Sequence, residues 1–183
     1  MGKYFKKIFY LFIFVYFLSV TNISSGFQIN ERKFNKLNSN SEWEILNSGI
    51  SDRYLNSIFM ISNDTGWVAG QDGIILKTTD SGITWNSQMS ATNEWIYSIF
   101  FIDDQKGWAT GQNGMIIKTT NGGATWTEIS KFTSSWFFSV FFIDDDNGWV
   151  SGQNGLVYNT SDGGNSWNLQ YSGAYWLLSL IHI

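Results

Sequence analysis

A short apolar pattern recurs three times along the chain. It begins at Ser57, Ser98 and Ser139, each time as a serine followed by four apolar residues, and successive copies lie 41 residues apart. Repeats of about 40 residues with short apolar runs, Gly-Trp pairs and glycine turns are typical of propeller blades, in which each four-stranded sheet buries its faces against its neighbours. The sequence therefore predicts an all-β propeller over 43–183, with blades near 57–97, 98–138 and 139–178.

The first repeat illustrates the four strands that the pattern predicts. Residues 57–61 form the innermost strand, and a polar turn leads to a second strand over 67–70. A third strand over 74–78 follows Gln71-Asp72-Gly73, where the Asp-Gly pair favours the positive φ angles of a two-residue turn. The outer strand is expected to begin at Ile83.

The two ends of the repeat array differ from its middle. Trp43-Glu44-Ile45-Leu46 has the pattern of an outer strand without a blade of its own, and Trp176 to Ile183 starts another inner strand, so that 179–183 is a partial blade. Propellers commonly close by pairing an N-terminal outer strand with the inner strands of the last blade. We therefore expect a fragment of a larger propeller; closure by another subunit is the alternative, and open blade edges would favour self-association.

The N-terminus has the pattern of a secretory signal. Lys3, Lys6 and Lys7 precede an apolar stretch over 8–20 that carries no charge, and small polar residues follow it. This stretch is shorter than a membrane-spanning helix requires. We predict a signal peptide over 1–26 and a linker over 27–42, hence a secreted, periplasmic or cell-surface protein; an uncleaved membrane anchor is the alternative.

Composition narrows the classes of partner. The chain has no cysteine, so export does not imply a disulfide framework. Its formal charge of −4 becomes −7 without the three lysines of the signal segment. So acidic a protein is not expected to bind nucleic acid or an anionic membrane surface.

Each repeat also contains a turn motif, seen in Thr78-x-Asp80-x-Gly82-x-Thr84-Trp85, that resembles the Asp-box of bacterial neuraminidase (BNR) repeats. Its spacing suits a structural role, because the acidic or amide side chain accepts backbone N–H bonds, the glycine takes a conformation that other residues resist, and the tryptophan packs beneath the turn. The predicted Asp-box residues are Asp80, Gly82, Trp85, Asn121, Gly123, Trp126, Asp162, Gly164 and Trp167.

The Asp-box, the upstream Gly-Trp-x-x-Gly-x-x-Gly pattern and the apolar inner strand together resemble the photosystem II stability and assembly factor family of propellers. The resemblance covers about 43–183. It implies an exported, non-enzymatic and typically seven-bladed propeller without a cofactor, which acts as an assembly scaffold for a membrane-protein complex. The arginine-bearing surface associated with the family has little counterpart here, since Arg32 and Arg53 are the only arginines in the sequence.

Glycoside hydrolysis is the competing function, because sialidases and other glycosidases use Asp-box propellers. Two arginines cannot form the three-arginine cluster with which sialidases hold the substrate carboxylate. Ordinary glycosidases need two carboxyl groups across a cleft, and the non-repeated acids Glu94, Glu128 and Asp52 are the candidates. Each is more simply a solvated charge.

Two other constellations are weak. His182 is the only histidine and has no nucleophile in its context, so a catalytic triad is not supported. The run Asp144-Asp145-Asp146 lacks the spacing of an EF-hand loop and aligns with an ordinary turn of the preceding repeat, so we predict no metal site there.

A possible binding face follows from residues placed just before each inner strand. An aromatic group occurs there in every repeat, and these connections should share one end of the blades with the Gln-Asp-Gly and Gln-Asn-Gly turns. Aromatic rings flanked by amides bind extended peptides or sugars, although the rings would equally serve as wedges between blades. The candidates are Tyr54, Trp95 with Tyr97, Trp136 with Phe137, Tyr175 with Trp176, and Gln71, Gln112 and Gln153.

Overall fold

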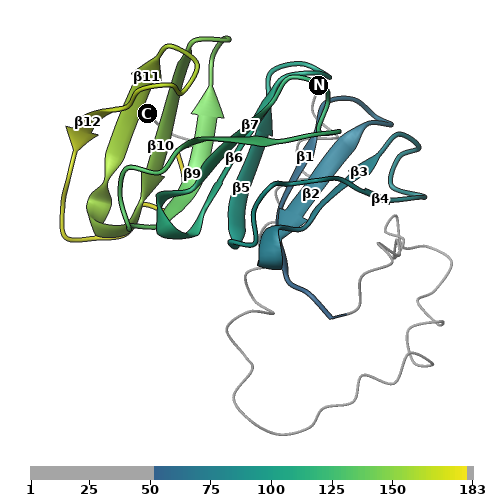
Figure 1. The fold of residues 1–183 in the computed structure, drawn as a ribbon, viewed down its shortest axis with the longest axis horizontal. Helices are drawn as coiled ribbons and strands as arrows, with labels where there is room; N and C mark the ends of the chain where they lie inside the picture. The colour runs from purple at the N-terminus through teal and green to yellow at the C-terminus, as the bar shows by residue number, and fades with distance from the viewer. Residues whose placement is uncertain (1–51, 181–183) are drawn as a thin grey trace, which may run out of the picture. The chain divides into compact units, whose positions relative to one another are not determined.

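The computed structural model describes residues 52–180, which form three four-stranded antiparallel sheets in succession along the chain. In each sheet the order of the strands is their order in the sequence, and neighbouring sheets contact each other through their inner strands β1, β5 and β9 (Figure 1). We call each sheet a blade. Blade 1 contains β1 (Leu55–Met60), β2 (Gly66–Gly70), β3 (Ile75–Thr78) and β4 (Asn86–Ser87); blade 2 contains β5 (Ile96–Phe101), β6 (Gly107–Gly111), β7 (Ile116–Thr119) and β8 (Thr127–Ser130); blade 3 contains β9 (Phe137–Phe142), β10 (Asn147–Gly152), β11 (Val157–Ser161) and β12 (Asn168–Tyr171).

The middle strands are buried on both faces because successive side chains point to opposite sides of a sheet. All five residues of β6 are buried. Ala109 packs in the cluster between blades 1 and 2, whereas Trp108 packs in the cluster between blades 2 and 3. One strand of mixed small and aromatic residues thus serves two interfaces.

The outer strands begin later than the sequence predicts. β4 starts at Asn86 rather than at Ile83, because the Asp-box holds the preceding residues in its turn: the Thr84 backbone N–H donates to Asp80 Oδ1 at 2.8 Å. The turn between β2 and β3 is also one residue longer than predicted. It is a 3-10 turn over Gln71–Gly73, in which Asp72 has φ 54° and Gly73 has φ 69°.

The predicted strand at the C-terminal end is not formed over 176–180, where the chain has no strand assignment. These residues nevertheless follow the path of an inner strand, since the Leu180 N–H donates to Ser139 Oγ at 3.3 Å. A strand needs a neighbour to pair with, and the described residues supply none on that side.

Residues 1–51 and 181–183 lie outside the described part of the chain. They contain the predicted signal peptide, the linker, the N-terminal outer strand and His182. Within 52–180 no helix is long and apolar enough to cross a membrane.

The blades are joined by a bond from a tryptophan to the Asp-box turn of the next blade. Trp67 Nε1 donates to the Gly122 carbonyl at 3.0 Å, and Lys77 Nζ donates to the same oxygen at 3.0 Å. The Lys77 ammonium also lies 5.0 Å from the Trp67 ring centroid. The Trp67 ring stacks on Phe101 at a centroid distance of 3.6 Å, so one indole makes a hydrogen bond, a cation-π contact and a stack across the interface.

The interface between blades 2 and 3 repeats this arrangement. Trp108 Nε1 donates to the Gly163 carbonyl at 3.1 Å, Lys118 Nζ reaches the same oxygen at 3.4 Å, and the Trp108 ring stacks on Phe142 at 3.7 Å. We call these two arrangements the inter-blade clamps. The role of the clamp lysines, Lys77 and Lys118, was not predicted, although an Ile-x-Lys-Thr pattern occurs in both repeats.

A second set of bonds links the inner strands. Ser57 Oγ accepts the Ile99 N–H at 3.2 Å, Ser98 Oγ accepts the Val140 N–H at 3.3 Å, and Ser139 Oγ accepts the Leu180 N–H. We call this the serine ladder. It satisfies one N–H group of β5, one of β9 and that of Leu180, on edges where an unpaired backbone would otherwise recruit another chain.

The clamp predicts a specific loss of stability on substitution of Trp108 by phenylalanine. The ring keeps its stack on Phe142, but the hydrogen bond to Gly163 is lost and a small void is left. We expect the free energy of unfolding to fall by about 1–3 kcal/mol, measured by urea titration of the full chain. Trp149→Phe is the matched control, because no carbonyl within 52–180 accepts the indole N–H of Trp149; an equal loss in both variants would contradict the role of the hydrogen bond.

Candidate functional site

The Asp-box carboxylates are engaged inside their own turns. Asp162 accepts the Ser166 N–H at 2.9 Å, the Ser166 hydroxyl at 2.6 Å and the Thr160 hydroxyl at 2.8 Å. Asp80 has the same three partners in its turn, from Thr84 and Thr78. In the second repeat Asn121 Oδ1 accepts the Thr125 N–H at 3.0 Å, so an amide replaces the acid without loss of the turn.

These hydrogen bonds determine the protonation state of the boxes. The Ser166 hydroxyl, then the Ser166 backbone and the Thr160 hydroxyl, lower the pKa of Asp162 to about 2. The Thr84 hydroxyl and backbone lower the pKa of Asp80 in the same way. A carboxylate with so low a pKa is a poor proton donor at neutral pH, so neither aspartate suits general acid catalysis.

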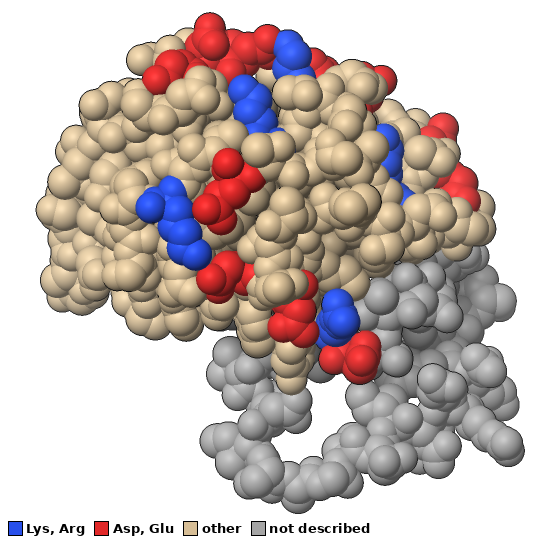
Figure 2. Space-filling view, in the orientation of Figure 1, with Lys and Arg blue, Asp and Glu red and all other residues tan. Residues whose placement is uncertain are grey.

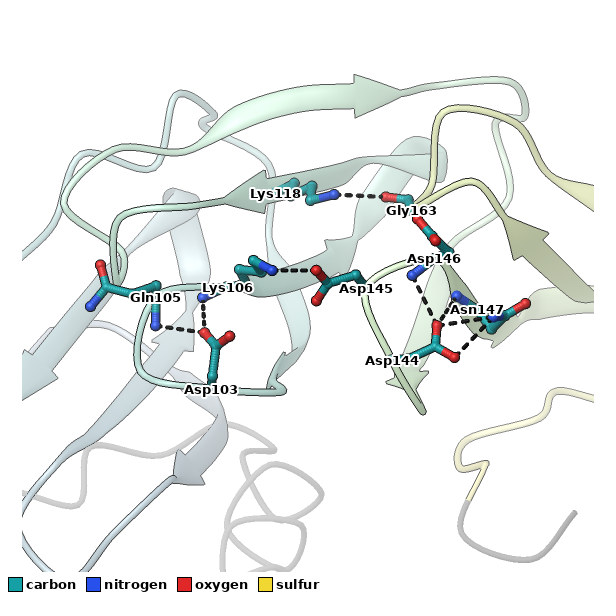
Figure 3. A network of polar contacts seen from close by, with 9 residues as sticks. All are labelled: Asp103, Gln105, Lys106, Lys118, Asp144, Asp145, Asp146, Asn147 and Gly163. Carbon is teal, nitrogen blue, oxygen red and sulfur yellow. Dashed lines mark hydrogen bonds and ion pairs between the residues drawn. The ribbon is translucent and has the colours of Figure 1, made fainter.

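The acidic run at 144–146 lies in the turn between β9 and β10. Asp144 Oδ1 accepts the Asp146 and Asn147 backbone N–H groups at 2.9 and 2.7 Å, which lowers the Asp144 pKa mainly through Asn147. Asp145 pairs instead with Lys106 of the preceding blade, and this ion pair raises the pKa of Lys106 (Figure 3). Both groups are exposed to solvent, so the pair contributes little to stability.

The three candidate catalytic acids are not brought together. Glu94 precedes β5 and is held by the Asn113 amide at 3.0 Å and by Lys131 at 3.4 Å. Glu128 lies on the outer strand β8, and Asp52 precedes β1. No contact among residues 52–180 joins any two of these acids, and no group of three or more His, Asp or Glu in that range is placed to hold a metal ion.

Acidic side chains gather along one edge of the visible face in Figure 2, where only a few lysines accompany them. At one end of the blades lie the Asp-boxes and the turns that follow the inner strands. We call it the Asp-box end, and the opposite end, where the inner strands begin, the aromatic end. The Asp-box end holds most of the aspartates, and the hydrogen bonds described above engage several of them within the protein.

Aromatic side chains line the aromatic end in two groups of ring contacts, one between blades 1 and 2 and one from blade 2 to the C-terminal segment. Tyr54 of blade 1 lies 6.0 Å from Trp95 of blade 2 between ring centroids. In the second group, Trp136 lies at 5.8 Å and Phe138 at 5.3 Å from Tyr97. Phe138 lies 5.6 Å from Trp176 in turn. We call Tyr54, Trp95, Tyr97, Trp136, Phe138 and Trp176 the aromatic row.

The row is partly open to solvent and partly packed between blades. Tyr54 is 51% exposed and Trp176 is 58% exposed, whereas Trp95 and Trp136 are half-buried. Each ring contact that crosses from one blade to the next also fills space between them. The rings thus serve as wedges and at the same time present aromatic surface.

Three glutamines fix the connections that carry the row. Gln153 Oε1 accepts the Trp136 N–H at 3.0 Å, and Gln112 and Gln71 accept the Trp95 and Tyr54 N–H groups at 3.4 Å. Only an oxygen can accept these bonds, so each side-chain Nε2 is the atom left for other partners. Gln112 Nε2 donates to the Tyr97 hydroxyl at 3.2 Å.

The structure changes which residues make up the predicted aromatic binding face. Phe137, predicted beside Trp136, is fully buried in the core between blades 2 and 3, and Phe138 takes its place in the row. The alternation of a strand gives the reason, since residues two apart share a side. Tyr175 is 83% exposed and no ring contact to it is described.

The serine ladder was not predicted from the sequence, although a serine recurs at the same position of each repeat.

The sequence profile of the family described as photosynthesis system II assembly factor YCF48 matches residues 35–134, which is more than half of the chain. The chain belongs to this family. A search of curated protein sequences finds no significant match.

Solved structures agree with the family and the predicted fold. A YCF48 from Cyanidioschyzon merolae superposes with a TM-score of 0.55 at 25% identity, covering 63% of this chain and 39% of that one. A YCF48 bound to D1 peptide gives a TM-score of 0.57 at 22% identity and covers 64% and 41%. The chain thus spans about two fifths of the length of these relatives. The prediction of a β-propeller of the photosystem II assembly factor type is confirmed.

Two glycoside hydrolases share the fold alone. An ancestral GH74 enzyme gives a TM-score of 0.58 at 15% identity, covering 72% of this chain and 20% of that one. The GH74 enzyme of Niastella koreensis gives 0.55 at 18%, covering 68% and 24%. Fold likeness at such identities does not transfer an activity.

The depressed pKa of Asp162 predicts an acid-dependent loss of stability. Unfolding raises this pKa from about 2 to its ordinary value of 3.8, so its contribution is complete above about pH 5 and is lost as the pH falls through 2. We expect the urea midpoint of the full chain to fall between pH 4 and pH 2. Asp162→Asn, which copies the natural Asn121 box, should show a smaller fall, while Asp80 retains its own share. An unchanged acid dependence in that variant would contradict the assignment.

Proposed function

We propose that this chain is part of an exported, non-catalytic propeller scaffold that binds a segment of a partner protein during assembly of a membrane-protein complex. Family membership is the observation that carries the proposal, because the matched family is described as a photosystem II assembly factor. The aromatic row supplies the surface. It is the partly open set of apolar side chains that crosses all three blades at one end.

The chemistry of the acids favours binding over hydrolysis. A glycosidase needs one carboxyl group that is protonated near neutral pH and a second placed across from it. The Asp-box acids have lowered pKa values, and Glu94 is engaged by Asn113 and Lys131. Glycoside hydrolysis and carbohydrate binding remain the two competing hypotheses.

Recognition through the aromatic row differs from recognition through an arginine surface. Arg53 is the one arginine among residues 52–180, so bidentate capture of carboxylates cannot dominate on these blades. We propose instead that rings and amides hold the partner segment. The predicted signal peptide would place this interaction outside the cytoplasm, at the membrane or cell surface.

The D1 peptide present in the YCF48 structure is the first probe. We expect the full chain to bind it saturably in isothermal titration calorimetry. Trp176→Ala should weaken binding by about tenfold, the usual cost of removing an aromatic anchor from an interface. Because Trp176 is 58% exposed, the variant should keep the circular dichroism spectrum of the parent.

Tyr171→Ala is the matched control. Tyr171 is 59% exposed, lies on the outer strand β12 and makes no described ring contact with the row, so its loss should leave D1-peptide binding unchanged. Equal effects of the two substitutions would argue against the row as the site. Absence of D1-peptide binding together with turnover of a chromogenic glycoside would overturn the scaffold proposal in favour of the enzyme.

A further inference from the structure

We propose that the aromatic row recognises a proline-rich segment in the polyproline II conformation. This inference rests on the proposed function and specifies its partner. It follows from the kinds of polar group that the row leaves free, from the capping of the inner-strand edges, and from the charge beside the rings.

The free polar groups of the row are nearly all hydrogen-bond donors. The Oε1 atoms of Gln71 and Gln153 already accept backbone N–H bonds, so their Nε2 groups remain as donors with no acceptor among residues 52–180. The indole N–H groups of Trp95, Trp136 and Trp176 likewise have no acceptor in that range. The Tyr54 hydroxyl can both donate and accept, and the Tyr97 hydroxyl, which accepts the Gln112 amide, keeps its own O–H as a donor.

A donor surface selects for a ligand that offers acceptors. Sugar hydroxyls and ordinary peptide segments bring their own donors, which need acceptors on the protein if they are to be buried without cost. A polyproline II segment presents carbonyl oxygens and apolar ring faces, and its prolines have no N–H. Tryptophan and tyrosine surfaces bind such segments in other recognition domains.

The serine ladder opposes strand addition, which is the main alternative mode of peptide recognition. A peptide that adds as a strand needs free backbone N–H and C=O groups on a sheet edge. On the inner edges, Ser57, Ser98 and Ser139 already accept the N–H groups of Ile99, Val140 and Leu180. These N–H groups are not available to an added strand, which favours recognition of a segment by side chains at the aromatic end.

The charge beside the rings suits a neutral segment. Glu94 is the acid next to Trp95 in sequence, and both of its carboxylate oxygens lie 3.0 Å from the Asn113 amide nitrogen. Lys131 lies 3.4 Å from one of them, so this acid is already compensated. Arg53 beside Tyr54 and Asp72 beside Gln71 carry opposite charges, so stacking and neutral hydrogen bonds are expected to provide most of the affinity.

Glutamine-to-glutamate substitutions test the donor argument with little change of shape. In Gln153→Glu a carboxylate oxygen still accepts the Trp136 N–H, but the Nε2 donor is gone. We expect the affinity of the full chain for decaproline, measured by calorimetry, to fall by about 2- to 12-fold, as for one lost hydrogen bond. Gln105→Glu is the control, because Gln105 is exposed in the turn between β5 and β6 at the Asp-box end. It adds the same charge without touching the row, so the affinity should stay within about twofold of the parent.

Three ligands complete the experiment: decaproline, a (Gly-Ser)₅ peptide of the same length, and cellohexaose. Saturable binding of decaproline alone supports the inference. Binding of cellohexaose or of (Gly-Ser)₅ as tightly as decaproline overturns it, and so does an equal effect of the two glutamate variants. If the D1 peptide binds but decaproline does not, the inference fails and the scaffold function stands; if neither binds, both fail.

Discussion

The hydrogen bond from a buried indole to the carbonyl of the next Asp-box turn holds these blades in register. Trp67 and Trp108 donate it to Gly122 and Gly163, and in each case a lysine reaches the same oxygen. The carbonyl is in place because Asp-box side chains bond within the turn and a glycine follows with a positive φ; Gly123 has φ 88°. A Cβ on Gly123 would also come within 2.8 Å of the Trp67 indole nitrogen. The motif that shapes one blade thus fastens it to the blade before.

This arrangement divides the molecule chemically into two ends. At the Asp-box end, acidic and hydroxyl groups bond to each other, to backbone N–H groups and across blades, as Asp162 and Asp145 illustrate. At the aromatic end, the glutamine oxygens are engaged, but the amide nitrogens of Gln71 and Gln153 and several indole N–H groups have no acceptor among residues 52–180.

The relation to GH74 enzymes shows how little the blade itself says about activity. These enzymes superpose as well as the YCF48 structures do, with TM-scores of 0.58 and 0.57 for the first of each kind. Blade packing depends on repeated residues such as Trp67 and Phe101, whereas catalysis depends on acids that occur once. In the described blades Glu94, Glu128 and Asp52 remain on separate elements, so the shared fold carries no shared site there.

The sequence by itself determined the blade architecture and the family, because a 41-residue period repeats strand, turn and Asp-box positions at fixed offsets, and these are local properties of the chain. It also placed aromatic residues before the inner strands and glutamines after the second strands of the same blades. Only the tertiary structure decided that Phe138 rather than Phe137 joins the row, that Lys77 and Lys118 share an acceptor with an indole, and that Ser57 caps an edge one blade away. Those outcomes depend on which side a strand turns toward its neighbour and on partners about 40 residues distant, and the order of residues along one repeat does not contain them.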